Sequence, residues 1–309
     1  MQDRRKKPDI SATFKSLDTE EAIDLYFYRP VGYRWALLFE RFGVSPNTVT
    51  VAAIFIGIVA GVCFYFRDMA VNVAGMLLLV WANTYDSADG QLARMTGKIS
   101  PMGRMLDGFC GDLWFITIYA AICFRLMPQW GVWIWLLGAF TGYFHSRQAA
   151  MADYYRNIHL LFLKGKSGSE LSHSAILKEE YKRLGWKKDF FYKLANVLYT
   201  HYTAGQEQWS PRFQRMMRVL RERYGDEAPG WFREAFRTKS LSLMKYANML
   251  SFNTRIIALF AALFMDRPWL YFVFEATVLN GMLLYMTVRH ERFCAAFTER
   301  LTAETAEYD

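Results

Sequence analysis

Residues 86–112 read DSADGQLARMTGKISPMGRMLDGFCGD, a segment that places several carboxylates where two apolar runs meet. Asp86 and Asp89 are three residues apart and would share one face of a helix, and Asp107 follows in the next apolar run. An acidic side chain within a membrane helix costs about 2.5–3.5 kcal/mol on insertion scales, so several acids together indicate function. Carboxylate oxygens suit hard cations such as magnesium, manganese or calcium. The segment therefore predicts a hard-metal site beside membrane helices.

Apolar runs long enough to cross a bilayer surround this segment. A membrane-spanning helix needs about 20 mostly apolar residues, and the 53% of hydrophobic residues in this chain are unevenly distributed. We therefore expect an all-α, polytopic membrane protein. Its six predicted transmembrane helices lie at about 47–66, 70–93, 103–125, 129–152, 245–265 and 268–288.

These spans predict five parts along the chain. A cytoplasmic N-terminus with an interfacial helix comes first, followed by four spans that include the acidic segment. A basic cytoplasmic helical insertion, two further spans and a cytoplasmic tail complete the chain. The predicted bounds of the five parts are 1–46, 47–153, 154–243, 244–290 and 291–309.

Basic residues are concentrated on one side of the predicted spans. They precede the first span, lie between the second and third, and fill the insertion, whereas the other connections are short and nearly neutral. The positive-inside rule then places both termini and the acidic segment in the cytoplasm, at what we expect to be a bacterial inner membrane. The net charge of +8 follows from this bias and from attraction to anionic headgroups, so no nucleic-acid partner is expected. The amino end, MQDRRKK, has no apolar core behind it, so we expect no cleavable signal.

Local signals predict how the chain enters its first span. Residues 32–42 mix apolar and charged side chains in the pattern of an interfacial amphipathic helix on the cytoplasmic surface. Ser45 can then cap the first span, with Pro46 at its first helical position. The four cysteines have no paired spacing, so neither a disulfide framework nor a zinc site is expected.

The insertion is too long for an ordinary loop, so we expect it to have a structure of its own. A flexible joint is predicted at 164–169, KGKSGS, and helices are predicted at about 172–200 and 211–224. Pro211 at the start and Gly225 at the stop delimit the second helix. Its arginines recur every three residues and favour a solvated or lipid-headgroup face, with a docking surface for a partner or second subunit as the alternative. These arginines are Arg212, Arg215, Arg218 and Arg221.

The acidic segment resembles the signature of the CDP-alcohol phosphotransferase family, D-x2-D-G-x2-A-R-x8-G-x3-D-x3-D. One position differs, because Gly111 stands where the family has its fourth aspartate and Asp112 follows one residue later. The family also typically has a surface helix and a Pro-Asn-x-x-Thr start to its first span, here Pro46 to Thr50. The positions in register are Asp86, Asp89, Gly90, Ala93, Arg94, Gly103 and Asp107.

The resemblance implies an enzyme of phospholipid synthesis that transfers a phosphatidyl-type group from a CDP-activated lipid to an alcohol and releases CMP. Magnesium or manganese, held by Asp86, Asp89 and Asp107, would neutralise the charge that builds on the phosphate oxygens. Arg94 would clamp a phosphate or, alternatively, extend to the membrane surface, and the family also suggests a homodimer. The residues expected at the donor nucleotide are Gly90, Ala93, Arg94, Gly103, Asn47 and Thr50.

The displaced fourth acid leaves the proton acceptor open. In the family this aspartate is the expected general base, and on a regular helix position 111 lies about 40° from Asp107, whereas Asp112 lies about 140° away. A π-bulge, favoured by Gly108 and Gly111, would bring Asp112 into place. His145 is the second candidate for the base, and a path through the donor-bound metal or a loss of activity are further alternatives.

Cationic and polar residues near the ends of the fourth and fifth spans are expected to bind the acceptor. Buried arginines in a helix bundle need anionic partners, which would be either Asp153 or Glu275 or a phosphate on the acceptor. The phosphate interpretation favours inositol phosphate or inositol, as in the phosphatidylinositol-phosphate synthase branch of the family, because ethanolamine, serine or choline would not require such cations. Serine, ethanolamine or glycerol phosphate are the alternative acceptors. The residues assigned to the acceptor are Arg147, Arg255, Lys245 and Asn248.

Two other classes of protein could also place several acids in membrane helices. An ion or proton transporter would place acids in its helices, but it would not need Gly90, Arg94 and Gly103 at these offsets. A catalytically inactive membrane scaffold is the second alternative, and it rests on Gly111. Metal-dependent release of CMP separates these alternatives from the transferase.

Overall fold

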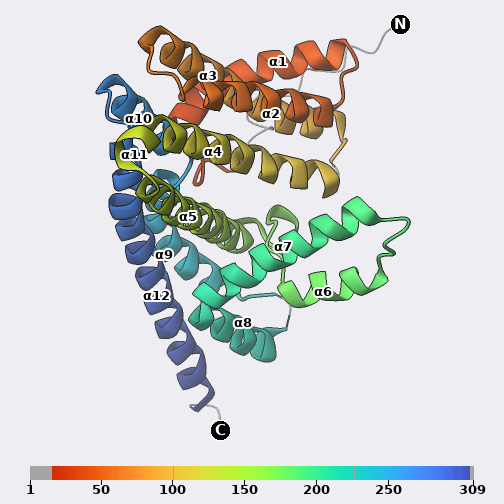
Figure 1. Ribbon diagram of the computed structural model, residues 1–309. Helices are drawn as coiled ribbons and strands as arrows, with labels where there is room; N and C mark the ends of the chain where they lie inside the picture. Colours follow the sequence, from red (N-terminus) through yellow and green to blue (C-terminus); the bar gives the residue numbers. More distant parts are fainter. Residues whose placement is uncertain (1–15, 100, 226, 307–309) are drawn as a thin grey trace, which may run out of the picture. The chain divides into compact units, whose positions relative to one another are not determined.

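The computed structural model of this chain describes residues 16–99, 101–225 and 227–306 (Figure 1). These residues are almost entirely helical and contain no β-strand, so the predicted all-α class is confirmed. The basic amino end, MQDRRKK, lies outside the described residues. The helices divide into two compact units, one formed by residues up to Ser146 with Arg255–Ala276, the other by Arg147–Thr254 with the residues from Thr277 onward.

The first unit contains the acidic segment. Helices α2, α3 and α4 follow one another along the chain, and α2 packs against both of the others (Figure 1). The elements of this unit are the π-helix η2 (Asp24–Tyr28), α1 (Arg29–Arg41), α2 (Pro46–Cys63), α3 (Met69–Thr96), α4 (Pro101–Trp130), the first part of α5 (Trp133–Lys164), most of α10 (Phe252–Phe264) and α11 (Trp269–Phe274).

Local capping residues begin and end these helices, and the predictions for Ser45 and Pro46 are confirmed. The Ser45 side chain accepts a hydrogen bond of 3.2 Å from the backbone N–H of Thr48, and Pro46 is the first residue of α2. Asp68 caps α3 by accepting from the Val71 N–H at 3.1 Å. At the other end of α3, Gly97 has a φ of 68°, a left-handed conformation that glycine adopts without a steric penalty.

Small residues on α2 allow α4 to approach closely. A Cβ atom on Gly57 would lie 2.1 Å from the indole nitrogen of Trp114, so no larger residue fits there without movement. The same indole N–H donates to the Ala53 carbonyl at 3.1 Å. Gly61, one turn later, faces Thr117 in the same way. Ala53, Gly57 and Gly61 recur every four residues, the small-xxx-small spacing that lets helices approach each other closely.

Helix α1 packs its apolar side on α3. Trp35 stacks on Phe39 with ring centroids 5.6 Å apart and meets Tyr85 of α3 at 5.2 Å. Gly32 lies directly against the Ser87 side chain. The helix spans 29–41, close to the predicted 32–42, and its placement on a membrane surface stays a prediction.

Within the described residues, four helical stretches are long and apolar enough to cross a membrane, which supports an integral membrane protein: Pro46–Cys63, Leu106–Trp130, Gly230–Phe264 and Trp269–Ala303. They correspond to the predicted spans one, three, five and six. Spans two and four correspond to α3 and α5, which fall short by the same criterion within the described chain. Polar side chains, such as Asn72 and Asp86 in α3 and His145, Arg147 and Gln148 in α5, lower their mean hydropathy. The six-span topology therefore stays a prediction.

The second unit contains the predicted insertion. The single helix predicted at 172–200 is two helices, because residues 184–189, LGWKKD, interrupt it, whereas the helix predicted at 211–224 has these bounds and ends at Gly225 with a φ of 68°. The elements are the last part of α5, the 3-10 turn η3 (Lys166–Gly168), α6 (Ser174–Arg183), α7 (Phe190–Trp209), α8 (Pro211–Tyr224), α9 (Gly230–Met249) and α12 (Asn280–Ala306), which the π-helix η4 (Glu275–Leu279) precedes.

Helix α8 packs on α12 with its apolar residues (Figure 1). Phe213, Met216 and Leu220 are buried, whereas all four arginines of the predicted basic face are exposed. Exposed arginine side chains are compatible with the predicted solvated or lipid-headgroup face of α8. The docking alternative stays a prediction.

Candidate active site

Three carboxylates of the signature, carried by helices α3 and α4, come close together. Asp86 and Asp89 project from α3 and Asp107 from α4, and each offers an oxygen within 4.8 Å of the others. Asp89 is buried, Asp86 half-buried and Asp107 exposed. Three ionised carboxylates at this spacing repel one another, and a bound cation removes that repulsion. Two oxygens on opposite sides of a divalent ion lie about 4–5 Å apart, so the group fits a hard cation.

Two neighbouring side chains orient these carboxylates. The buried Thr50 hydroxyl of α2 hydrogen bonds to Asp89 Oδ2 and lies 3.2 Å from the Pro46 carbonyl oxygen. The Cys110 side chain of α4 hydrogen bonds to Asp86. Hydrogen bonds of this kind fix the direction in which a ligating side chain presents its oxygens. Thr50, predicted at the donor nucleotide, and Cys110, which no motif singles out, both hydrogen bond to the carboxylates.

The arginine of the signature lies close to the same group. A Cβ atom on Gly90 would lie 3.5 Å from both terminal nitrogens of Arg94, so the guanidinium rests on the glycine surface. Arg94 is half-buried and its charge acts on Asp89. The phosphate clamp and the extension to the membrane surface both stay predictions. Roles for the half-buried Asn47, Ala93 and Gly103 at the donor stay predictions.

The helix that carries the displaced acid is regular. α4 is an α-helix from Pro101 to Trp130, so the predicted π-bulge between Asp107 and Asp112 is wrong. A regular helix turns Asp112 away from Asp107, and Asp112 is exposed and outside the carboxylate group. Position 111 is open, because a Cβ atom on Gly111 would meet no atom within 4 Å.

His145 belongs to a separate buried network in the first unit. Its Nδ1 lies 2.9 Å from the Tyr119 hydroxyl and 2.8 Å from Arg255 Nη1. Arg255 Nη1 in turn lies 2.7 Å from Glu275 Oε1, which also accepts a hydrogen bond of 2.6 Å from Tyr271. Arg255 is 1% exposed and Glu275 is fully buried. Of the two alternatives for Arg255, the ion pair with Glu275 is therefore the one that the geometry supports.

We expect Arg255→Met to destabilise the protein by about 3–5 kcal/mol, because it leaves the Glu275 charge buried without its partner. The double variant Arg255→Met/Glu275→Leu should recover most of this loss, since apolar pairs often replace buried ion pairs at little cost. Thermal unfolding in detergent measures both. If Arg255 instead binds an acceptor phosphate, the folded double variant will show an acceptor KM raised about tenfold or more.

The other predicted acceptor residues belong to the second unit. Arg147 is half-buried against α7, where a Cβ atom on Gly205 would lie 2.2 Å from its Nη1. Asn248 Oδ1 accepts a hydrogen bond of 2.7 Å from Arg156, a cation that the sequence analysis did not identify. Lys245 is exposed, with its ammonium 4.9 Å from the Tyr246 ring centre. The role of these side chains at an acceptor stays a prediction.

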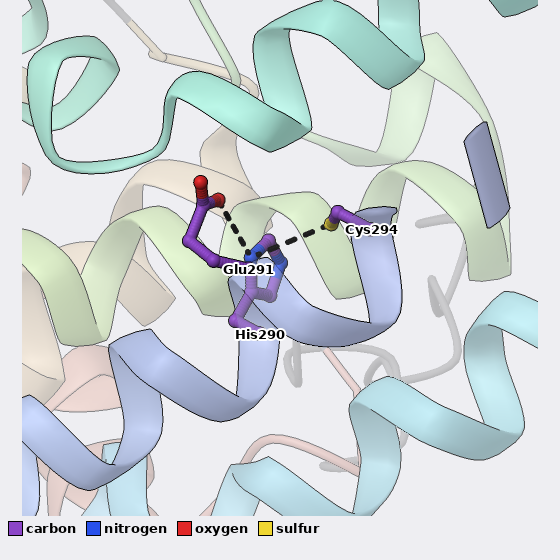
Figure 2. Close-up of side chains that lie close together, drawn as sticks. All are labelled: His290, Glu291 and Cys294. Carbon is purple, nitrogen blue, oxygen red and sulfur yellow. Dashed lines mark hydrogen bonds and ion pairs between the residues drawn. The ribbon is translucent and has the colours of Figure 1, made fainter. Parts of the chain in front are cut away.

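A second group of metal-type ligands lies on α12. Figure 2 shows His290, Glu291 and Cys294, with His290 Nδ1 3.6 Å from Cys294 Sγ and 3.8 Å from a Glu291 oxygen. The Glu291 carboxylate already accepts the backbone N–H groups of Arg212 and Phe213 at 2.7 and 3.3 Å. We interpret the group as a cap that joins α12 to the start of α8.

Parts of this chain are similar in sequence to known proteins. Relatives include the archaetidylinositol phosphate synthase of Pyrococcus horikoshii, 32% identical over 111 residues, which are 36% of this chain and 57% of that protein. The bifunctional IPC transferase and DIPP synthase of Aquifex aeolicus is 27% identical over 161 residues, 50% of this chain and 36% of its own length. Cholinephosphotransferase 1 of Mus musculus is 27% identical over 124 residues, 36% of this chain and 31% of its own length.

The matched part covers the candidate site. The alignments span between 31% and 57% of the length of these relatives. Residues 43–159 also match the sequence model of a CDP-alcohol phosphatidyltransferase. All three carboxylates, Thr50, Arg94 and the open position at Gly111 fall within these residues, so the part of the chain that carries the candidate site is similar to the CDP-alcohol phosphatidyltransferase family.

Proposed function

We propose that this protein transfers a substituted phosphate group from a CDP-activated lipid to a small alcohol and releases CMP. The observation that carries the proposal is the group of Asp86, Asp89 and Asp107, whose oxygens meet from two helices inside the family segment. We further propose that it works as a homodimer in a bacterial inner membrane, with this site on the cytoplasmic side. The basic connections described above support that orientation.

A divalent cation, magnesium or manganese, is the proposed cofactor. All three ligands are carboxylate oxygens, the donors that hard cations prefer. The ion would neutralise the negative charge that develops on the phosphate oxygens during transfer. Thr50 and Cys110 hold two of the carboxylates in place before substrate arrives, so that little reorganisation is needed at the moment of reaction.

Arg94 is the proposed ligand of the donor phosphates. Its guanidinium is held along α3 at Gly90, where charge-assisted and bidentate hydrogen bonds to phosphate oxygens are possible. The small side chains of the signature would let the nucleotide approach the helix backbone. The residues proposed to contact it are Gly90, Ala93, Gly103 and Asn47.

Inositol phosphate or inositol is the proposed acceptor. The name of the Pyrococcus relative, archaetidylinositol phosphate synthase, supports this choice. Arg147, Lys245 and Asn248 stay the proposed contacts, whereas Arg255 is committed to Glu275. Serine, ethanolamine and glycerol phosphate are the alternative acceptors.

Direct competition among acceptors tests the proposal. Purified protein is incubated with CDP-diacylglycerol, magnesium and an equimolar mixture of inositol 1-phosphate, inositol, serine, ethanolamine and glycerol phosphate. CMP is measured by chromatography and the lipid product by mass. We expect the inositol phosphate product to dominate. A dominant serine or ethanolamine product would reject the acceptor, and no CMP with any acceptor would favour the scaffold or transporter alternatives.

A further inference from the structure

Helix α7 carries a row of exposed apolar side chains outside the predicted membrane spans. Phe190, Leu194 and Leu198 are 49%, 43% and 45% exposed and recur every four residues, so they share one side of the helix. Trp186, in the connection that precedes α7, is 52% exposed. We call these four residues the α7 row.

The opposite side of α7 supplies its packing. Ala195, Asn196 and Thr203 are buried, and α7 packs against α6 in a helical hairpin (Figure 1). Phe190, Leu194 and Leu198 therefore lie away from this buried side, whereas the Trp186 ring meets Tyr181 of α6 edge-on with ring centroids 6.4 Å apart. A row of large apolar side chains exposed on one side of a helix indicates a surface that contacts a membrane or another protein.

Basic residues surround the tip of this hairpin. Arg183, Lys187 and Lys188 are exposed on either side of Trp186. Lys193 is buried beneath them, where its ammonium donates to the Leu184 carbonyl at 2.7 Å and lies 5.1 Å from the Trp186 ring centre. The loop at the tip therefore exposes Trp186 next to basic side chains. Apolar and aromatic residues on one side with Lys and Arg beside them are typical of helices that lie in a membrane interface.

We propose that the α7 row inserts into the headgroup region of the anionic bilayer in which the chain resides. Phe190, Leu194 and Leu198 would enter the acyl boundary, Trp186 would sit at headgroup level, and Lys187 and Lys188 would attract anionic lipids. A stable protein interface takes about 20–30 residues on each side, far more than this row of four. Contact with a bilayer needs no such area. The apolar helices before and after the hairpin would already hold it at the membrane, so its effective concentration there would be high.

Spin-label accessibility in proteoliposomes tests this proposal on the full chain. In a background without the four native cysteines, nitroxides are attached at Phe190→Cys and Leu194→Cys, with the exposed Glu222→Cys of α8 as control. Collisions with oxygen, which concentrates in lipid, are compared with collisions with a water-soluble nickel complex. Liposomes are made of phosphatidylcholine with or without phosphatidylglycerol.

We expect the labels at 190 and 194 to collide mainly with oxygen and the label at 222 mainly with nickel. Lys187→Gln/Lys188→Gln should reduce the oxygen preference at 194 in phosphatidylglycerol liposomes and leave the thermal midpoint in detergent unchanged. Nickel access at 190 and 194 equal to that at 222 would overturn the proposal, because the row would then lie in water. Exclusion of both reagents would overturn it too, because a protein partner or second copy would then cover the row.

Discussion

Asp89→Asn is expected to lower turnover by at least about 10²-fold, the loss seen when one preorganised charge-stabilising group is removed. Asp89 is the buried member of the carboxylate group and the one that Thr50 orients, so its amide would bring no charge to the cation and would disturb a fixed hydrogen bond. Excess EDTA should abolish activity of the parent protein, and added magnesium or manganese should restore it. CMP release in detergent measures both effects.

The matched control for this variant lies at the other end of the same helix. Asp68 caps α3 through the Val71 N–H and is not part of the carboxylate group, so Asp68→Asn should keep turnover near the parent value. Asparagine is also a good helix cap, so little stability should be lost. Full activity in EDTA, or equal activity of the two variants, would reject the metal assignment.

Features that depend on a few neighbouring residues were predictable from the sequence. The caps at Ser45 and Pro46 and the stop at Gly225 are set within one turn of the helix concerned. The spacing of Asp86 and Asp89 fixes their common face whatever the rest of the chain does. Their meeting with Asp107 followed from the signature, and the structure brings the three together as expected.

Features that depend on distant residues were not predictable in this way. Thr50 meets Asp89 across 39 positions, and Tyr119 meets Glu275 across 156, and no local pattern encodes either contact. An anionic partner for Arg255 was predictable from the sequence, but whether that partner is Glu275 or a phosphate was not. The break before α7 was missed because residues 184–189 contain one glycine and no proline, a weak signal against a strongly helical pattern.

The proton acceptor is the part of the mechanism that most needs an experiment. We propose Asp112 for this role, acting through a water molecule in the open space beside Gly111, because a general base can work through one water and often lies off line in an unliganded structure. His145 is a weaker candidate, since Tyr119, Arg255 and Glu275 enclose its Nδ1. Asp112, by contrast, is an exposed side chain.

Asp112→Asn should then lower turnover by about 10²–10⁴-fold, the usual contribution of general base catalysis, while the affinity for the CDP-lipid stays near that of the parent.

The double variant Gly111→Asp/Asp112→Gly moves the acid back to the position that the family signature gives it. A side chain at 111 meets open space and no positive φ, so the double variant should fold and regain much of the activity that Asp112→Asn loses. Turnover and equilibrium binding of a CDP-lipid, measured separately, distinguish loss of the base from loss of the donor site. If Asp112→Asn stays active while a folded His145→Ala variant is inactive, the proton leaves through the buried network instead and Asp112 is only a surface residue.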